Sequence, residues 1–131
     1  MAKICKVLVV EDNEHIRQLL ADVLDQEGYH FTVVANGEEM RRALAGGDVD
    51  VVILDMVLRG SENGLSLARE AAELGVGVIL TTGSITHRDA LEQCGHRYLF
   101  KPFRLSALLQ LIDEVLKTTK ARCEVKDRAY G

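Results

Sequence analysis

Short apolar runs alternate with amphipathic stretches along this chain, and that alternation constrains the fold more than any other feature. The apolar runs have the length of β-strands and are Cys5–Val10, His30–Ala35, Val49–Leu54, Gly77–Thr81 and Arg97–Phe100. Parallel strands need crossover connections, and a helix after each strand provides them. The sequence therefore predicts an α/β fold, a five-stranded parallel sheet with helices on both faces.

The stretches between these runs have the residue spacing of amphipathic helices. Apolar residues in the first stretch recur at intervals of three and four, which places them on one helical face. Gly28 follows that stretch, in the position where glycine commonly ends a helix. The expected helices begin near Glu14, carry Met40 to Leu44, carry Leu65 to Leu74, and run over Ile85–Gln93 and Arg104–Thr118. We expect one domain over residues 1–119 and a tail over residues 120–131.

Composition excludes several classes of partner. Sixteen basic residues against 20 acidic residues give a formal net charge of −4, which provides no electrostatic footprint for nucleic acid or an anionic membrane. No apolar run approaches the roughly 20 residues that cross a bilayer. The three cysteines, Cys5, Cys94 and Cys123, have no metal-type spacing, and their odd number argues against a disulfide framework. We therefore expect free thiols in a reducing, cytoplasmic protein.

Polar residues stand directly at the ends of four of these strands. Glu11 and Asp12 follow the first strand, Asp55 the third, Thr82 the fourth and Lys101 the fifth. Because the crevice of such a sheet lies at the carboxyl ends of its strands, these side chains should meet there. Each of them alone has an ordinary structural explanation; Asp12 or Asn13, for example, would suit the cap of the first helix. Their arrival at one edge from separate strands is what indicates a site.

Three neighbouring carboxylates repel one another unless a cation lies between them. Oxygen ligands suit a hard ion, so Glu11, Asp12 and Asp55 predict a site for Mg²⁺ (or Mn²⁺). Such an ion shields charge when a carboxylate attacks phosphorus, and aspartyl phosphate is a known covalent intermediate. Lys101 would pair with one phosphoryl oxygen, and the Thr82 hydroxyl would donate to another. The predicted chemistry is therefore phosphoryl transfer, in which positioning and electrostatics provide most of the catalysis.

Four segments resemble the receiver domain of two-component response regulators. They are V-L-V-V-E-D-N (Val7–Asn13), V-V-I-L-D-M-V-L (Val51–Leu58), V-I-L-T-T-G (Val78–Gly83) and Y-L-F-K-P-F (Tyr98–Phe103). One segment alone is a weak signal, whereas all four in this order are specific, and the resemblance extends from Lys3 to Thr118. It implies a (βα)5 flavodoxin-like receiver fold and a function in phosphorelay signal transduction.

The resemblance also implies roles for the residues at the sheet edge. Asp55 matches the phosphoacceptor, which takes its phosphoryl group from the phosphohistidine of a histidine kinase. Asp12, Asp55 and the backbone carbonyl of Val57 match the direct protein ligands of Mg²⁺. Glu11 matches an acidic residue that acts on the metal through a water molecule.

A switch is implied by the same comparison. Thr82 matches the family's switch hydroxyl and Lys101 its lysine, while Tyr98 matches an aromatic residue that swings inward when the hydroxyl moves toward the phosphoryl group. The Lys101–Pro102 peptide bond is commonly cis in the family. This movement would alter the surface from Ile85 to Phe103 and the start of the last helix, which is the expected output face.

The partners implied are a sensor histidine kinase or phosphotransfer protein and a downstream protein target, or an output domain that is not in this chain. A homodimer through the fourth helix, the fifth strand and the fifth helix is compatible with the output face. We expect no enzyme with small-molecule turnover, but a switch that assists its own phosphorylation and dephosphorylation.

Three other functions share parts of this pattern. A phosphatase of the haloacid dehalogenase class also has an aspartyl nucleophile after a parallel strand, but that class resembles D-x-D, whereas Met56 and Val57 follow the acid here. A flavodoxin-like carrier needs hydroxyl and amide donors after the first strand, where two acids would repel a flavin phosphate. An unphosphorylated docking module would lack one of the site residues, and none is missing. The histidines lack ligand spacing and are expected as surface or packing residues: His15, His30, His87 and His96.

Overall fold

The computed structural model describes residues 3–58, 63–118 and 123–124. Within them, five parallel strands form one sheet, which confirms the predicted fold class. Across the sheet the strands lie in the order β3 (His30–Val34), β2 (Lys6–Val10), β4 (Val51–Asp55), β5 (Gly77–Thr82) and β6 (Arg97–Phe100). The strands start and end within two residues of the predicted bounds, and β4 at the centre includes Asp55 as its last residue.

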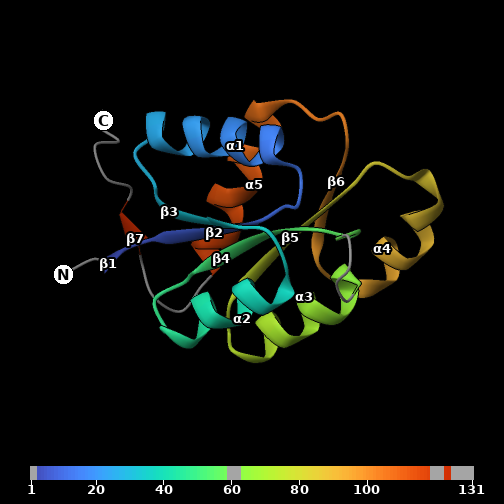
Figure 1. The fold of residues 1–131 in the computed structure, drawn as a ribbon, viewed down its shortest axis with the longest axis horizontal. Helices are drawn as coiled ribbons and strands as arrows, with labels where there is room; N and C mark the ends of the chain where they lie inside the picture. Colours follow the sequence, from blue (N-terminus) through green and yellow to red (C-terminus); the bar gives the residue numbers. More distant parts are fainter. Residues whose placement is uncertain (1–2, 59–62, 119–122, 125–131) are drawn as a thin grey trace.

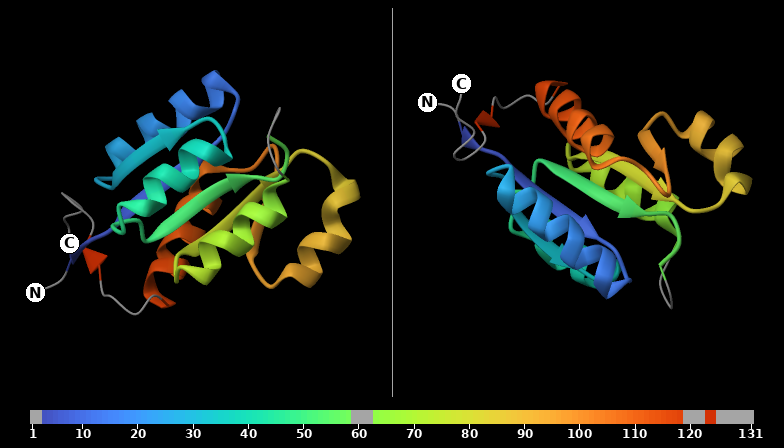
Figure 2. Two further views of the ribbon diagram at one scale, coloured as in Figure 1. Left: turned by 60° about the horizontal axis from the view of Figure 1, so that its bottom comes forward. Right: turned by 90° about the horizontal axis from the view of Figure 1, so that it is seen from above.

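Helices cover both faces of the sheet (Figure 1). Helices α1 (Glu14–Gln26) and α5 (Leu105–Thr118) pack on one face, and α2 (Gly37–Ala45), α3 (Gly64–Glu73) and α4 (Arg88–Cys94) lie on the other. Figure 2 shows the same two layers with the bottom of Figure 1 turned forward and from above. The predicted helix over Ile85–Gln93 is divided, because a 3₁₀ turn η1 (Ile85–His87) precedes α4.

Alternation along the strands explains why both faces are covered. In β2, Val7 and Val9 belong to the core under α1 and α5, while Leu8 and Val10 belong to the core under α2, α3 and α4. All five residues of β4 are buried. Burying one such apolar side chain stabilises the fold by about 1.5–3 kcal/mol, so a strand with apolar residues on both faces is stable only between two layers of helices.

Asparagine side chains begin the helices that follow three of the strands. The amide oxygens of Asn13, Asn36 and Asn63 accept hydrogen bonds from backbone N–H groups in the first turns of α1, α2 and α3. These caps satisfy donors that a helix N-terminus leaves unpaired. Asn13 therefore caps α1, which resolves the alternative between Asp12 and Asn13. At the other end of α1, Gly28 has φ +82°, as predicted for a helix terminator.

Two features near the chain ends were not predicted. The two-residue strands β1 (Lys3–Ile4) and β7 (Cys123–Glu124) pair in parallel, with Lys3 beside Cys123. Cys5 is disulfide-bonded, so the prediction of free thiols is wrong for this residue. Cys94 is free, as predicted. Because disulfides are rare in reducing compartments, the cysteines no longer support a cytoplasmic location. Residues 59–62 and the remaining residues of the tail lie outside the described residues.

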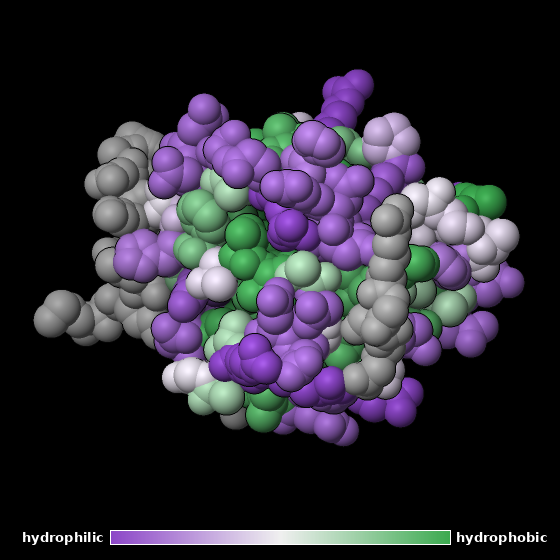
Figure 3. All heavy atoms as spheres, viewed as in Figure 1, coloured by the Kyte–Doolittle hydropathy of each residue, from purple (hydrophilic) through white to green (hydrophobic). Residues whose placement is uncertain are grey.

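The surface of the domain is mostly hydrophilic on the face seen in Figure 3. On the face seen in Figure 3, hydrophilic side chains cover most of the helices, and hydrophobic residues reach the surface over the edge of the sheet between α1 and α2. Strand β3 forms that edge, and its residues are partly or fully exposed. Among the described residues, no helix combines the length and apolar character needed to cross a bilayer.

Candidate functional site

The carboxyl ends of the strands bring the predicted site residues together. Glu11 follows β2, Asp55 ends β4, Thr82 ends β5 and Lys101 follows β6. The register aligns these ends, because Val10 is the partner of Leu54 and Asp55 is the partner of Thr81. Backbone hydrogen bonds continue beyond the strands, from Met56 N–H to the Thr81 carbonyl at 2.8 Å and from Lys101 N–H to the Thr82 carbonyl at 2.7 Å.

Three carboxylates lie at this edge. Glu11, Asp12 and Asp55 each present an oxygen, and these oxygens lie within 4.8 Å of one another. Glu11 is 3% exposed and Asp55 7% exposed, so little solvent screens their charges. Such a cluster is stable as a set of carboxylates only with positive charge beside it.

Lys101 supplies one positive charge. Its Nζ donates to Glu11 Oε1 at 2.9 Å and to Asp55 Oδ2 at 2.9 Å. Burial alone would lower the pKa of Lys101, but the hydrogen bonds to Glu11 and Asp55 outweigh it and raise the pKa above its usual 10.5. The ammonium is therefore held in its charged form between the two acids. The Lys101–Pro102 bond is cis, as the family resemblance implied.

Backbone groups fix the orientation of Asp55. Its Oδ1 accepts a hydrogen bond from the Val57 N–H at 3.0 Å, so both carboxylate oxygens have a donor. The Gly64 N–H donates to the Met56 carbonyl at 2.9 Å, which ties the start of α3 to the acceptor strand. A Cβ on Gly64 would lie 2.6 Å from Met56 Cα and 2.7 Å from the Asp55 carbonyl oxygen. Glycine is therefore required at this helix start.

The two predicted switch residues make side-chain contacts with residues other than the carboxylates. Thr82 is 1% exposed, and its Oγ1 is 2.7 Å from His87 Nδ1 and accepts from the Ser84 N–H at 3.2 Å. Among the described residues, the hydroxyl makes no hydrogen bond to Asp55. Tyr98 is half-buried on β6, and its ring meets that of Phe100 edge to face at 5.8 Å between centroids.

Three contacts at the site were not predicted. Arg17 Nη1 donates to the Glu11 carbonyl at 2.9 Å, and the Asn13 N–H donates to Glu11 Oε2 at 3.2 Å. His87, expected only as a surface or packing residue, bonds the Thr82 hydroxyl. Arg17 could have been found from its place one turn into α1 beside the acidic pair. No sequence signal indicated His87, because the contact depends on the path of η1.

The donor set fits a hard divalent ion. It consists of the carboxylate oxygens of Glu11, Asp12 and Asp55. Mg²⁺ commonly takes one or two carboxylates and completes its shell with water and phosphate oxygens. Lys101 already offsets part of the negative charge, so one divalent ion would bring the group of three acids and one lysine to zero net charge.

We expect Mg²⁺ to bind less tightly as the pH is lowered. The loss of affinity should begin at a higher pH than the titration of an ordinary glutamate. Burial raises the pKa of Glu11 above its usual 4.5, more than its hydrogen bond with Lys101 lowers it, and the charge of Asp55 adds to the increase. As pH falls through this raised pKa, Glu11 takes up a proton and the site loses a negative charge. Calorimetric titration with MgCl₂ between pH 5 and pH 8 should therefore show weaker binding at the lower pH. In Glu11→Gln, this part of the pH dependence should be absent; an unchanged profile would contradict the assignment.

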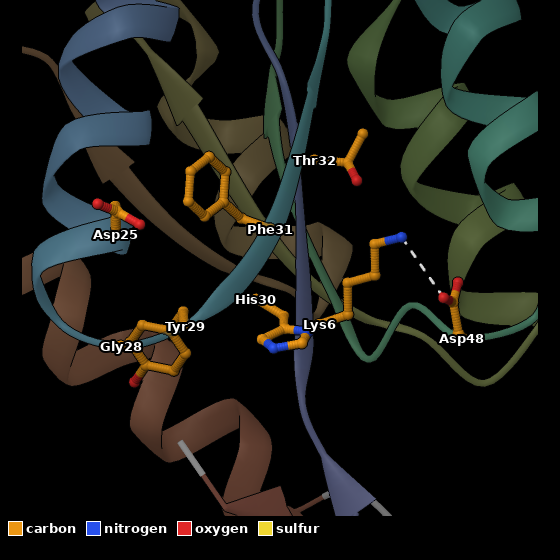
Figure 4. Close-up of a pocket in the computed structure, with 8 residues that line it drawn as sticks. All are labelled: Lys6, Asp25, Gly28, Tyr29, His30, Phe31, Thr32 and Asp48. Carbon is orange, nitrogen blue, oxygen red and sulfur yellow. Dashed lines mark hydrogen bonds and ion pairs between the residues drawn. The ribbon is translucent and has the colours of Figure 1, made fainter. Parts of the chain in front are cut away.

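A cavity lies at the opposite ends of the strands, away from the carboxylates. Its volume is about 400 Å³, and Figure 4 shows its lining side chains, among them Lys6 and His30, which begin β2 and β3. Lys6 is 3.4 Å from Asp48. The side chains labelled in Figure 4 lie on both sides of the strands and do not converge on one point. This cavity is therefore separate from the cluster of carboxylates.

Comparisons with known proteins agree with this geometry. Residues 7–113 match the response regulator receiver domain family, and the chain belongs to that family. It is therefore a receiver domain of the kind that two-component response regulators use in phosphorelay signalling.

Similar proteins include two transcriptional regulatory proteins and a response regulator of known structure. The transcriptional regulatory protein TcrA of Mycobacterium tuberculosis is 36% identical over 107 residues, which are 79% of this chain and 42% of TcrA. TorR of Escherichia coli is 34% identical over 114 residues, 84% of this chain and 49% of TorR. The chain thus spans less than half the length of these two relatives. The response regulator TrrA of Thermotoga maritima, solved with Mg²⁺ and BeF, is 32% identical with a TM-score of 0.77, over 86% of this chain and 100% of that one.

Proposed function

We propose that Asp55 accepts a phosphoryl group from the phosphohistidine of a sensor histidine kinase or phosphotransfer protein. The observation that supports this most strongly is the joint contact of Lys101 with Glu11 and Asp55 beside Asp12, at the end of the central strand. Asp12, Asp55 and the Val57 carbonyl would hold Mg²⁺ (or Mn²⁺) directly, and Glu11 would act through a water molecule. The complex of TrrA with Mg²⁺ and BeF supports a metal-dependent site in this fold.

The transfer is a single displacement at phosphorus. An oxygen of the Asp55 carboxylate forms the new P–O bond, while the P–N bond of the donor breaks and its electron pair returns to the imidazole. The bound metal ion would shield the negative charge of the carboxylate and the phosphoryl oxygens from each other. Asp55 is already oriented by the Val57 N–H and the Lys101 ammonium. Lys101 then exchanges its contact with the carboxylate for one with a phosphoryl oxygen.

The protein is thus a switch and not an enzyme that turns over a small molecule. The Thr82 hydroxyl would move to a phosphoryl oxygen, and Tyr98 would turn inward into the space that this leaves. The altered surface would be that of α4, β6 and α5, through which the domain would bind a protein target, an output domain or a second copy of itself.

We propose a cytoplasmic location because the kinases that would phosphorylate it act on cytoplasmic partners.

An aspartyl phosphatase is the main alternative from another class. Such an enzyme needs a second acid two residues after the nucleophile, and Val57 holds that position with its apolar side chain 57% exposed. Among the described residues, Glu11 and Asp12 are the acids beside Asp55, and both fit the metal and not the role of that proton donor. The chemistry of the described site therefore favours a stable phosphoacceptor over a phosphatase.

Intact mass after incubation with acetyl phosphate and MgCl₂ tests the proposal. We expect the mass of one added phosphoryl group, which should not appear when a chelator is present during the incubation or in Asp55→Asn. Asp48→Asn is the matched control, because Asp48 is an exposed acid in the loop before the same strand. If folded protein gains no phosphoryl group from acetyl phosphate or from any phosphohistidine donor, the domain is a docking module. Multiple turnover of a phosphate ester would instead indicate a phosphatase.

A further inference from the structure

The hydroxyl of Thr82 has two partners on the side of α4. Its Oγ1 accepts from the Ser84 N–H at 3.2 Å and is 2.7 Å from His87 Nδ1. A hydroxyl has a single proton to donate. The hydroxyl oxygen has two acceptor sites, so the tautomer of His87 decides which of the two atoms donates. When the imidazole carries its proton on Nε2, Thr82 donates its single proton to Nδ1. The hydroxyl proton is then committed to His87.

A phosphoryl group on Asp55 would compete for the same proton. Its terminal oxygens accept hydrogen bonds and do not donate them, so Thr82 cannot donate to a phosphoryl oxygen and to His87 at once. We propose that His87 is a positioning residue that holds Thr82 in the resting arrangement and is released when Thr82 turns to the phosphoryl group. This proposal rests on the function proposed for Asp55 and goes beyond it.

The position of His87 explains how its release would reach the output face. His87 is the last residue of η1 and the N-cap of α4, and its side chain makes no capping hydrogen bond to that helix. The bond to Thr82 therefore ties the start of α4 to the end of β5. The next residue, Arg88, places its guanidinium carbon 5.6 Å from the centre of the Phe100 ring, and Phe100 in turn contacts Tyr98. Loss of one hydrogen bond thus affects a chain of contacts from Thr82 to Tyr98.

There is also space beside the acceptor for the side chain to move. His87 lines a cavity of about 370 Å³ together with Met56 and Val57, the two residues that follow Asp55. The other lining residues are Leu58, Asn63, Leu65 and Ala90. A half-buried imidazole next to such a cavity can leave Thr82 without unfolding α4.

A ligand shifts a two-state equilibrium only by its differential affinity for the two states. If His87 stabilises the resting state, its removal lowers the free energy that is needed to change from the resting state to the phosphorylated state. For a single hydrogen bond the expected gain in affinity is about threefold to tenfold.

The experiment measures the affinity of the full chain for beryllofluoride in the presence of MgCl₂. We expect the apparent Kd of His87→Ala to be about threefold to tenfold lower than that of the wild type, as for the loss of one hydrogen bond. His87→Asn should restore the wild-type value, because the asparagine amide oxygen can take the place of Nδ1. In a Thr82→Val background, His87→Ala should have no effect, since the competing hydroxyl is absent. His96→Ala is the control, because His96 is also half-buried but lies beyond α4.

Several results would overturn the inference. Affinity that is unchanged or weaker in His87→Ala, or equally increased in the Thr82→Val background, shows that His87 does not restrain the hydroxyl. Nitrogen chemical shifts that place the His87 proton on Nδ1 in the free protein contradict the assigned donor. If the wild type binds no beryllofluoride, or Asp55→Asn binds it equally well, the function proposed for Asp55 fails and the inference fails with it.

Discussion

Replacing Gly64 with alanine should lower the free energy of unfolding by about 3 kcal/mol and prevent phosphorylation of Asp55. The added Cβ would lie 2.6 Å from Met56 Cα and 2.7 Å from the Asp55 carbonyl oxygen, distances that real Cβ atoms do not show. Both neighbours are backbone atoms, so no side chain can rotate away. Either α3 moves outward or the end of β4 does, and the orientation of the Asp55 carboxylate changes in both cases.

Chemical denaturation and acetyl phosphate labelling together measure this effect. Gly83→Ala is the matched control, because a Cβ on Gly83 meets nothing within 4 Å. We expect that control to be neutral or slightly stabilising, since alanine restricts the unfolded chain. Normal labelling of a stably folded Gly64→Ala variant would show that the close approach does not position the acceptor.

Replacing Lys101 with methionine should destabilise the metal-free protein by about 2 kcal/mol at neutral pH. The change leaves the Glu11 and Asp55 carboxylates, 3% and 7% exposed, without the ammonium that contacts both. Mg²⁺ should recover much of this loss, so the increase in stability on adding Mg²⁺ should be larger in the variant than in the wild type. Phosphoryl transfer should nevertheless be slower, because a metal ion does not replace the lysine contact to the phosphoryl oxygen.

The pH dependence of the wild type follows from the same lysine. Its pKa is raised in the folded state, so its contribution to stability is complete below the unfolded value of 10.5 and is lost as pH rises through the folded pKa. Urea unfolding with and without MgCl₂ measures the loss of stability in Lys101→Met and its recovery by Mg²⁺, and urea unfolding at increasing pH measures the pH dependence. Lys117→Met is the control, because Lys117 is a surface lysine 3.1 Å from Asp113 and 74% exposed, where an ion pair contributes little. Equal losses in the two variants would show that Lys101 is an ordinary surface charge.

The sheet and the convergence of the acids could be predicted because both follow from local patterns. Each apolar run had strand length, and each polar residue stood at the end of a run, so parallel topology alone placed Glu11, Asp55 and Lys101 at one edge. The division of the fourth helix could not be predicted, since Ser84 caps a 3₁₀ turn before α4 and the residue spacing alone does not distinguish that turn. The contact of Thr82 with His87 depends on that turn.

The errors near the chain ends have a different cause. Pairing of β1 with β7 involves two residues on each side, which is too short for a periodicity. The odd number of cysteines argued against a framework of several disulfides, but it did not exclude a single disulfide. Cys5 is fully buried between β1 and β2, where a small apolar side chain is as expected as a disulfide.

The burial of β4 has a consequence for the order in which parts of the domain open. Amide hydrogen exchange in a central strand usually requires nearly global unfolding, whereas a helix terminus exchanges through local fluctuation. Asp55 ends the strand in the centre of the sheet, and the segment that would read its state begins with a single 3₁₀ turn followed by a seven-residue helix. We therefore expect β4, which carries Asp55, to open more slowly than η1 and α4. The turn and the helix can then rearrange many times while the strand stays folded.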